Sequence, residues 1–318
     1  MTILSPPSGG IVVEHVGRSF GEVHAVKDAS LVALPGSVTA LIGPNGSGKT
    51  TLMLMLASLL RPDSGTIRIA GHDPVTEPAS VRSELGWMPD VLGSWASLTV
   101  RATLELTGRL YRMDRAAAAA RASELISLVG LGELADQPTR VLSRGQKQKL
   151  SLARSLVNDP AVLLLDEPAS GLDPAARVDL RLLVRRIASE GKTVLVSSHV
   201  LAELDEMADA AVYIDQGVTV SAERIAQTKT TLRAWRIKSA DAPALQAALI
   251  DAGVDATTIA ADRTELLVPL TGETAAAELL GRLVGSGIAI STFAPAVGDL
   301  EHTFLDLNRP DQSMGENR

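Results

Sequence analysis

Short apolar runs separated by turn residues predict a β-rich region at the start of the chain. The predicted strands span residues 11–16, 24–34, 37–42 and 66–70. Between the third and the fourth strand, residues 51–60 favour a helix, because helix-forming residues dominate there and the sequence Arg-Pro-Asp follows. The local order is therefore strand, loop, helix and strand.

The middle of the chain changes from a helical composition to an alternation of strands and helices. Residues 97–158 contain helix-forming residues and few strand signals, which predicts a helical insert. After this insert, apolar runs over residues 162–165, 193–197 and 211–214 predict buried strands with helices between them. Buried strands that alternate with helices are typical of a parallel sheet, so we expect an α/β fold.

The pattern after about residue 230 predicts a second, smaller domain. Strands are expected over residues 232–238, 254–260, 264–270 and 288–294, and helices over residues 242–252, 274–284 and from residue 299. The first six of these elements follow the order βαββαβ, which is the split-βαβ pattern of ferredoxin-like domains. We therefore expect a small ferredoxin-like α+β domain at the C-terminus.

These patterns divide the chain into four segments. We expect a flexible lead-in at residues 1–10, an α/β domain at 11–227, an α+β domain at 228–308 and a disordered tail at 309–318. The lead-in has no lysine, no arginine and no long apolar stretch, which makes it a poor signal peptide.

Composition and charge describe a folded chain without a strongly basic surface. Of the 318 residues, 46% are hydrophobic and 21% are charged, which is typical of a globular protein and excludes a disordered one. The net charge of −7 disfavours binding of nucleic acid through a basic surface. The absence of cysteine excludes disulfides, thiol nucleophiles and cysteine-bound metals. No apolar run approaches the roughly 18–20 residues of a membrane span, so we expect no membrane crossing.

Residues 43–50 read GPNGSGKT and fit the pattern GxxxxGK[ST] between an apolar run and a predicted helix. Its glycines let the backbone N–H groups point at phosphates, Lys49 reaches the β- and γ-phosphates, and Thr50 can bind Mg²⁺. A chance match is expected in roughly one chain in a hundred of this length, so we interpret the segment as a nucleotide-binding loop. The predicted nucleotide-binding residues here are Gly43, Pro44, Asn45, Gly46, Ser47, Gly48, Lys49, Thr50 and Thr51.

Two carboxylates, Asp166 and Glu167, directly follow the apolar run at residues 162–165. In open α/β sheets the carboxyl ends of the strands border the ligand crevice. Asp166 can therefore reach Mg²⁺ directly or through water, and Glu167 can act as a general base on an attacking water. Alone, such a pair often only closes a strand, but beside a phosphate loop a catalytic role is favoured.

The sequence Leu-Ser-Arg-Gly-Gln at residues 142–146 resembles the signature motif LSGGQ of ATP-binding cassette (ABC) ATPases. In that family the motif opens a helix whose N-terminus caps the γ-phosphate of an ATP held by the other subunit. The resemblance implies this role for Ser143, Gly145 and Gln146. Arg144 replaces the first glycine of the motif, which is compatible with the role if its side chain points away from the phosphates. From the residues alone, Ser143 is also a good helix N-cap.

Three further positions match the ABC family in order and spacing. The sequence Ser-Gly-Leu-Asp at residues 170–173 resembles the D-loop, which implies a part in the nucleotide site for Asp173. His199, which follows the predicted strand at 193–197, resembles the switch histidine that senses the γ-phosphate, although a lone histidine is usually structural or solvated. Phe20 matches the aromatic residue that stacks on adenine, and a core position is its alternative.

Asp90 departs from the family pattern. It ends the sequence GWMPD, where the family usually has a glutamine that contacts the metal and relays to a transmembrane partner. Subgroups related to antibiotic and multidrug exporters also carry an acidic residue there, and residues 299–305 resemble the end of their accessory domain. A carboxylate can ligate Mg²⁺, so Asp90 joins Thr50 and Asp166 as a predicted metal ligand. Because its charge repels those of the other carboxylates, we expect Asp90 to lie away from them without a cation.

The resemblance implies a fold and a function for the whole chain. The fold is a P-loop ABC cassette with a parallel sheet core, an antiparallel β subdomain and a helical insert, followed by the ferredoxin-like domain. The function is binding and hydrolysis of Mg-ATP in an ABC exporter, with Lys49, Glu167 and His199 as catalytic residues. Two copies, or this chain and a second cassette subunit, would form a dimer around two ATP molecules. A separate transmembrane permease would dock near residues 90–100, which places the chain in the cytoplasm at the inner face of the cell membrane.

Two other functional classes share parts of this pattern. A non-transport ABC ATPase that acts on ribosomes or nucleic acid is the main alternative. Such proteins typically carry two cassettes, whereas this chain has a single phosphate loop and no long basic linker. A switch protein of the GTPase kind would need a base-reading segment of the type NKxD, which the sequence lacks. We therefore expect no nucleic-acid partner.

Overall fold

The computed structural model describes residues 9–91, 93, 95–198, 200–220, 232–262, 265–298, 300 and 302–303. The chain divides into two compact units, Met1–Val220 and Ser221–Arg318. The predicted border at residue 227, the predicted tail, and most of the lead-in and of the helix predicted from residue 299 lie outside the described residues. Each unit is therefore described by itself.

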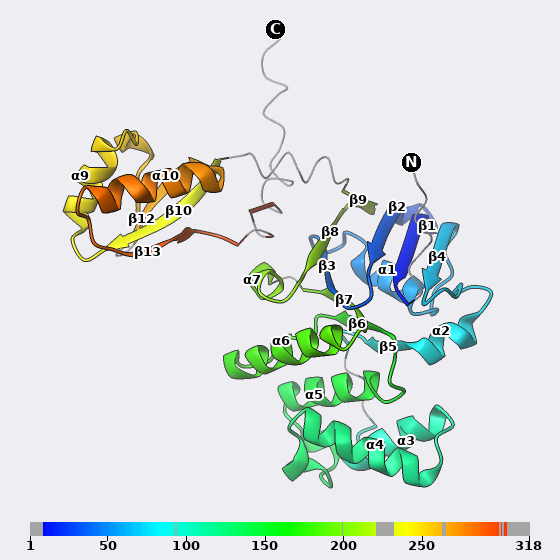
Figure 1. Ribbon diagram of the computed structural model, residues 1–318. Coiled ribbons are helices and arrows are strands. Elements are labelled where there is room, and N and C mark those ends of the chain that lie inside the picture. The colour runs from blue at the N-terminus through cyan, green and yellow to red at the C-terminus, as the bar shows by residue number, and fades with distance from the viewer. Residues whose placement is uncertain are drawn as a thin grey trace. The chain divides into compact units, whose positions relative to one another are not determined.

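A nine-stranded sheet forms the centre of the first unit (Figure 1). Across the sheet, the strands follow the order β4-β1-β2-β9-β8-β3-β7-β6-β5. Their bounds are β1 Ile11–Phe20, β2 Val23–Ala33, β3 Val38–Ile42, β4 Ser64–Ile69, β5 Leu85–Met88, β6 Val162–Asp166, β7 Thr193–Ser197, β8 Ala210–Asp215 and β9 Val218–Thr219. Strand β1 pairs antiparallel with β2 and β4, whereas β8, β3, β7, β6 and β5 are parallel neighbours. The predicted β-rich region and parallel sheet are both confirmed.

Burial of the central strands explains where the functional segments meet. Every residue of β3, β6 and β7 is buried, which is typical of parallel strands that helices cover on both faces. Asp166 at the end of β6 pairs with Ser197 at the end of β7. Because parallel strands end at the same edge of a sheet, the segments that follow β3, β6 and β7 come together at this edge.

Side chains cap four of the seven α-helices that the structure describes in the first unit. Their bounds are α1 Lys49–Leu56, α2 Pro78–Glu84, α3 Val100–Leu110, α4 Arg115–Leu128, α5 Arg144–Ser155, α6 Pro174–Ser189 and α7 Leu201–Asp205. The caps of α3, α4, α5 and α6 are Thr99, Asp114, Ser143 and Asp173, each of which accepts a backbone N–H three residues further on. Helices α3, α4 and α5 make up the predicted helical insert (Figure 1). Over the described part of the chain, none of the helices has the length and apolar character of a membrane span.

Helix α1 begins and ends earlier than the helix predicted over residues 51–60. Ser58 has a left-handed backbone with φ of 56°. The backbone N–H groups of Leu59 and Leu60 both bond to the carbonyl of Leu54, at 3.0 and 3.1 Å. These bonds close the helix end, so the two last leucines continue the apolar pattern without continuing the helix.

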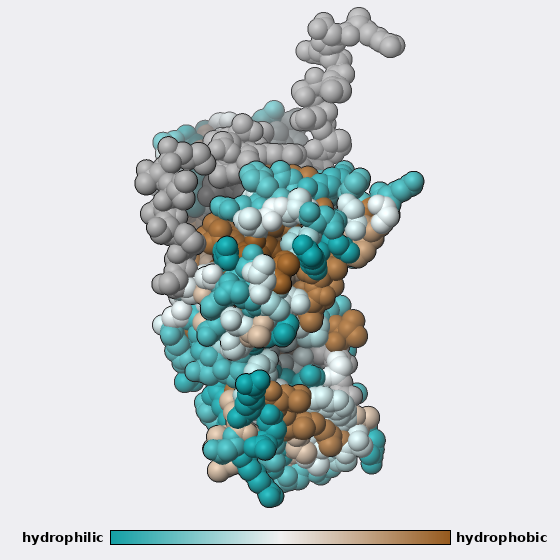
Figure 2. Space-filling model, turned by 90° about the vertical axis from the view of Figure 1, so that its right-hand side faces the viewer, coloured by the Kyte–Doolittle hydropathy of each residue, from teal (hydrophilic) through white to brown (hydrophobic). Residues whose placement is uncertain are grey.

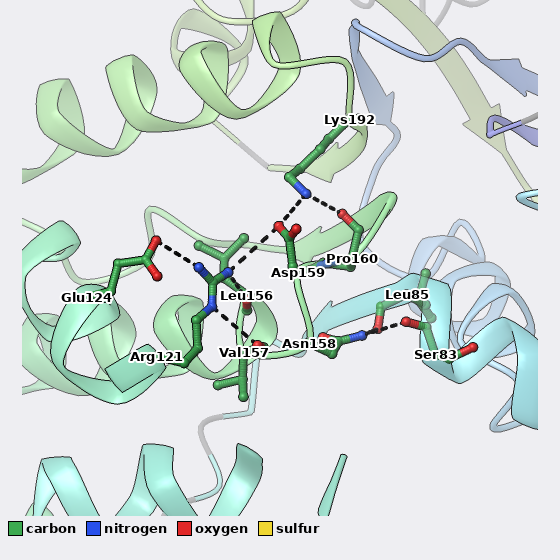
Figure 3. Close-up of polar contacts among 10 residues, drawn as sticks. All are labelled: Ser83, Leu85, Arg121, Glu124, Leu156, Val157, Asn158, Asp159, Pro160 and Lys192. Carbon is green, nitrogen blue, oxygen red and sulfur yellow. Dashed lines mark hydrogen bonds and ion pairs between the residues drawn. The ribbon is translucent and has the colours of Figure 1, made fainter. Parts of the chain in front are cut away.

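Hydrogen bonds and ion pairs connect the helical insert to the sheet just before β6 (Figure 3). Arg121 of α4 donates hydrogen bonds to the carbonyls of Leu156, at 2.7 Å, and Val157, at 3.3 Å. Lys192, ahead of β7, donates to the carboxylate of Asp159 at 2.7 Å, and this bond lowers the pKa of Asp159. Because the bonds reach the turn between α5 and β6 from both sides, they fix the end of α5 relative to the start of β6.

Over residues 232–295, the described part of the second unit contains a four-stranded antiparallel sheet and the helices α9 and α10. The strand order is β11-β12-β10-β13. The bounds are β10 Leu232–Ser239, α9 Ala242–Asp251, β11 Ala260–Asp262, β12 Glu265–Thr271, α10 Gly272–Gly285 and β13 Ile290–Pro295. Its core contains Ile237 and Val268 from the sheet and Leu249 and Leu279 from the helices. Along the chain these elements follow the order βαββαβ.

The strand predicted over residues 254–260 is largely wrong. Ala256–Thr258 form a 3₁₀ turn, and β11 begins only at Ala260. The carboxylate of Asp255 accepts hydrogen bonds from the backbone N–H of Thr257, at 2.9 Å, and from its hydroxyl, at 2.8 Å. Such local side-chain bonds compete with strand pairing, and here they hold a turn in a segment whose threonines favour a strand.

Candidate functional site

The phosphate loop, residues 43–48, connects the end of β3 to the start of α1. A Cβ on Gly43 would lie 2.2 Å from the carbonyl oxygen of Ile214, and one on Gly48 would lie 2.4 Å from that of Ala25. Gly48 also has φ of 105°, which a residue with a side chain rarely adopts. Helix α1 has no side-chain cap and no acidic residue in its first turn. Its first N–H groups and the positive end of its dipole are therefore available to bind an anion.

Lys49 is folded back over this loop. Its Nζ donates hydrogen bonds to the carbonyl oxygens of Gly43, at 2.7 Å, and Pro44, at 3.0 Å. Burial lowers the pKa of Lys49, while the negative charges of Glu167 and Asp166 act in the opposite direction. Lys49 is therefore an ammonium group that two backbone carbonyls hold at the loop, with two carboxylates near enough to affect its charge.

Asp166, at the end of β6, lies beside Thr50 of α1. Its Oδ1 accepts a hydrogen bond from the hydroxyl of Ser197 at 2.5 Å, and its Oδ2 accepts one from the hydroxyl of Thr50 at 3.4 Å. Burial raises the pKa of Asp166, the charge of Asp90 raises it further, and the two hydroxyls lower it. The structure thus brings together two of the residues that the sequence predicts as metal ligands.

Asp90 lines the same pocket as the phosphate loop, a cavity of about 450 Å³. The expectation that Asp90 lies away from the other carboxylates is therefore wrong. Strand β5 pairs with β6 in parallel register, with Met88 opposite Leu165, so the segment after β5 ends at the same edge of the sheet as Asp166. The predicted site residues on the wall of this cavity are Asn45, Gly46, Gly48, Lys49, Thr50, Thr51, Asp90, Asp166 and Glu167.

Glu167 has an unusual backbone conformation. Its φ of 52° lies in the left-handed region, which non-glycine residues seldom adopt. Pro168 follows it, and a residue before proline normally prefers an extended backbone. The N–H of Glu167 donates to the carbonyl of Ser197 at 3.2 Å, and its carbonyl accepts a hydrogen bond from Nε2 of Gln148 at 2.9 Å. Neighbouring groups thus hold Glu167 in this conformation at the wall of the pocket.

The residues of the signature-like motif form the first turn of α5. The Ser143 hydroxyl accepts a hydrogen bond from the N–H of Gln146 at 3.2 Å, and Oε1 of Gln146 accepts one from the N–H of Ser143 at 2.8 Å, which is a capping box. Arg144 donates to the hydroxyl of Ser170 at 2.8 Å and lines the pocket of its own chain. The side chain of Arg144 therefore borders the same pocket as the phosphate loop of its own chain and does not point away from it.

The remaining predicted site residues either do not line the pocket or lie outside the described part. Asp173 accepts the N–H of Ala176 at 2.9 Å and so caps α6. Phe20 ends β1, is 47% exposed and has the guanidinium of Arg18 4.8 Å from its ring centre, but it is not on the wall of the pocket. His199 lies outside the described residues. The roles of these three residues in nucleotide binding stay predictions.

Sequence reasoning missed two residues that support the carboxylates. The Ser197 hydroxyl bonds to Asp166 and also accepts the N–H of Glu167 at 3.2 Å. The signal for Ser197 is a polar residue at the end of the predicted strand that follows that of Asp166 along the chain. Gln148 is 2% exposed and reaches the carbonyl of Glu167, a contact that becomes visible only once α5 packs on the sheet.

Comparison with known proteins identifies relatives of this chain. Residues 26–170 match the family described as ABC transporter. The chain is 34% identical over 309 residues to the daunorubicin resistance ATP-binding protein DrrA3 of Streptomyces coeruleorubidus, with 96% of this chain and 98% of that protein covered. It is 38% identical over 212 residues to the Nod factor export ATP-binding protein I of Paraburkholderia xenovorans, with 66% and 69% covered. These relatives give no support to the alternative of an ATPase that acts on ribosomes or nucleic acid.

Solved structures show the same fold. An ATP-binding subunit of an ABC transporter superimposes with a TM-score of 0.63 at 25% identity and covers 69% of this chain and 92% of its own. A dimeric ATP-binding cassette in a post-hydrolysis state, bound to ADP and Pi, superimposes with a TM-score of 0.61 at 26% identity and covers 66% and 97%. The predicted cassette fold is therefore confirmed. The chain belongs to the ABC transporter family, as an ATP-binding and ATP-hydrolysing subunit related to those of drug-resistance and export systems.

Proposed function

We propose that the chain hydrolyses Mg-ATP in the pocket beside the phosphate loop and thereby drives an exporter. Lys49 and the loop N–H groups hold the β- and γ-phosphates, and Glu167 accepts a proton from the attacking water. Thr50 and Asp166 hold Mg²⁺, and His199, after β7, senses the γ-phosphate. The observation that carries the proposal is that Lys49 and the adjacent pair Asp166 and Glu167, which come from two separate segments of the chain, line one pocket.

The donors in this pocket fit Mg²⁺ as the cation. Thr50 offers a hydroxyl, and Asp166 and Asp90 offer carboxylates, which are the hard oxygen ligands that Mg²⁺ prefers. Among the residues that the structure describes, no group of three or more His, Cys, Asp or Glu side chains could hold a metal by itself. A cation here would share its coordination with phosphate oxygens and water, as is usual for Mg²⁺. When bound, it supplies positive charge that offsets the charge of the β- and γ-phosphates.

We propose that the working form is a dimer that encloses two ATP molecules. The start of α5 from one subunit, with Ser143, Gly145 and Gln146, would face the phosphates on the loop of the other subunit, where its backbone N–H groups bind anions. Asp173 would contribute from the start of α6. A dimeric cassette with bound ADP and Pi among the similar structures supports this arrangement. The second subunit is another copy of this chain or a second cassette protein.

We propose that a separate transmembrane permease docks on residues 90–100 and the helical insert. Large apolar side chains are exposed here, with Val91 81%, Leu110 68%, Trp95 41% and Tyr111 41% exposed. In Figure 2, hydrophobic side chains gather at the level of α3 and α4, which lie at the bottom of both views. Exposed apolar groups among polar ones mark protein interaction sites. The chain would thus lie in the cytoplasm, at the inner face of the cell membrane.

Fractionation of cells that express a tagged full-length chain tests the permease proposal. When a candidate transmembrane permease is co-expressed, the chain should sediment with membranes, and without that membrane protein it should stay in the supernatant. Leu110→Asp should reduce sedimentation and leave the ATPase rate of the purified chain unchanged, because the exposed Leu110 lies outside the pocket. Equal sedimentation with and without the membrane protein would contradict the proposal.

The proposed metal role of Asp90 predicts a change in Mg²⁺ dependence. Asp90→Ala should leave the affinity for ATP nearly unchanged but raise the Mg²⁺ concentration for half-maximal hydrolysis by about tenfold, a usual cost of losing a group that supports a metal site. Asp90→Gln, which restores an oxygen ligand, should keep most of the wild-type dependence. The measurement is the ATPase rate against Mg²⁺ concentration. An unchanged profile in Asp90→Ala would remove Asp90 from the metal site.

The proposed domain division predicts that the cassette folds without the C-terminal region. We propose a cassette at residues 11–227 and an accessory domain at 228–308, because the second unit has its own apolar core. A chain truncated after Gln227 should bind ATP with an affinity within about threefold of wild type, since every pocket residue precedes this point. Calorimetric titration with ATP, together with circular dichroism, measures this. A folded truncated chain that does not bind ATP would show that the border is misplaced.

A further inference from the structure

Two side chains of α5 donate hydrogen bonds to the two ends of the turn that follows Asp166. This turn, residues 167–170, is closed by a hydrogen bond from the N–H of Ser170 to the carbonyl of Glu167 at 3.1 Å. Gln148 donates to the same carbonyl at 2.9 Å, and Arg144 donates to the Ser170 hydroxyl at 2.8 Å. Residues four apart on a helix lie on the same face. One face of α5 therefore spans the turn and holds it at both ends.

Close packing keeps this face of α5 against the turn. The side chain of Arg144 lies across Gly171, because a Cβ there would be 2.6 Å from Cδ of Arg144. A Cβ on Gly145 would lie 3.3 Å from Cδ2 of Leu172, so the first turn of α5 also rests on this segment. Gln148 is 2% exposed, and its hydrogen bond to the carbonyl of Glu167 is partly buried. A hydrogen bond in such surroundings is stronger than one at the surface, and its loss leaves a carbonyl with one partner fewer.

The backbone of Glu167 needs an external constraint. Its φ of 52° is disfavoured for a residue with a side chain, and the following Pro168 favours an extended backbone instead. Glu167 would therefore relax toward the extended region if its carbonyl were released. Such a rotation redirects the carboxylate, which the backbone now presents to the wall of the pocket. The contacts from α5 oppose this relaxation.

We propose that Gln148 and Arg144 are positioning residues that hold Glu167 in the orientation needed for hydrolysis. Gln148 acts through the carbonyl of Glu167, and Arg144 acts through Ser170 at the other end of the turn. Arg144, which replaces the first glycine of the signature motif, thus has a positioning role within its own chain. This proposal rests on the role of Glu167 as general base, proposed above.

Two substitutions of Gln148 separate positioning from mere stability. Gln148→Leu keeps the size of the side chain but removes the donor, and it should lower kcat by about 10- to 100-fold, because a small misplacement of a catalytic group has effects of this size. The KM for ATP should stay within about twofold of wild type, because Gln148 is not on the wall of the pocket. Gln148→Glu places a buried carboxyl, whose pKa is raised by desolvation, against the carbonyl of Glu167. Its protonated form can donate the missing hydrogen bond, and its ionised form cannot.

The pH dependence of Gln148→Glu is the readout that a purely structural role would not give. The ratio of its kcat to that of wild type should rise as the pH falls, because the fraction of donating carboxylic acid increases. Dividing by the wild-type rate removes the effect of protonating Glu167 itself. Either a ratio that does not change with pH or a wild-type kcat in Gln148→Leu would overturn the positioning role of Gln148.

A double-mutant cycle tests the role of Arg144. Arg144→Met and Ser170→Ala each remove one side of the same hydrogen bond, so the double variant should be no slower than the slower single variant. Lys149→Gln is the matched control, because Lys149 also carries a positive charge on α5 but borders a different cavity, and its kcat should equal that of wild type. Multiplying effects in the double variant would show that Arg144 does not act through Ser170.

Failure of the base assignment and failure of the positioning role give different results. If Glu167→Gln hydrolyses ATP at the wild-type rate, the proposed function of Glu167 is wrong. If Glu167→Gln is inactive while Gln148→Leu keeps the wild-type kcat, the base stands and the positioning role is wrong. Melting temperatures of all variants, compared with wild type, show that each protein is folded.

Discussion

The Lys49→Ala variant should bind ATP about 10- to 100-fold more weakly than wild type and should show no measurable hydrolysis. The affinity change follows from the loss of a charge-assisted hydrogen bond to phosphate in a site otherwise built from backbone amides. Hydrolysis should suffer more than binding, because negative charge shifts among the phosphate oxygens in the transition state and Lys49 is the ammonium that the structure holds at the loop.

Equilibrium binding of ATP and steady-state release of phosphate measure the two effects. Lys27→Ala, which removes an exposed lysine outside the pocket, is the matched control and should behave like wild type. Because Lys49 also ties down the carbonyls of Gly43 and Pro44, circular dichroism should accompany the binding data. Wild-type affinity in folded Lys49→Ala would show that the loop is not the phosphate site.

Glu167→Gln should lower turnover by roughly 10² to 10⁴, the usual contribution of a positioned general base. Its affinity for ATP should stay close to wild type, because the amide has nearly the same size as the carboxylate. The substitution also leaves the contacts of Lys49 with the phosphate loop unchanged. With hydrolysis blocked, ATP should hold two chains together. Size-exclusion chromatography at high protein concentration should therefore show a dimer with Mg-ATP and a monomer without it.

Glu190→Gln provides the matched control for this substitution. Glu190 is an exposed carboxylate that follows α6 and pairs with Arg186, outside the pocket. It should hydrolyse ATP at the wild-type rate and should not accumulate a dimer. A Glu167→Gln protein that stays monomeric and hydrolyses ATP like wild type would exclude Glu167 as the base.

The sequence predicts those parts of the site that arise from local pattern and strand order. The loop at residues 43–50 has the spacing of glycines, lysine and threonine that phosphate binding requires. The structure shows why a side chain does not fit at Gly43 and Gly48, where a Cβ would clash with a backbone carbonyl oxygen. Asp166 and Glu167 could be placed at the sheet edge because a wholly apolar run precedes them. Carboxyl ends of parallel strands meet at one edge whatever the details of packing.

Other features depend on packing between distant segments, which single-sequence patterns do not encode. The bond of Arg144 to Ser170 joins residues 26 positions apart, and that of Gln148 to Glu167 joins residues 19 apart. The left-handed backbone of Glu167 runs against the local preference before a proline, so local rules predict the opposite conformation. Charge repulsion alone predicts the wrong place for Asp90, because the pairing of β5 with β6 determines where the following segment ends.

The dependence of specific ATPase activity on protein concentration tests the central claim most directly. If each active site needs the phosphate loop of one chain and the start of α5 of another, the rate per chain in saturating Mg-ATP is limited by dimer formation. We expect the rate per chain to fall toward zero on dilution and to rise to a plateau as light scattering reports the dimer. A rate per chain that stays constant down to concentrations where the protein is fully monomeric would show that each chain hydrolyses ATP without a second chain.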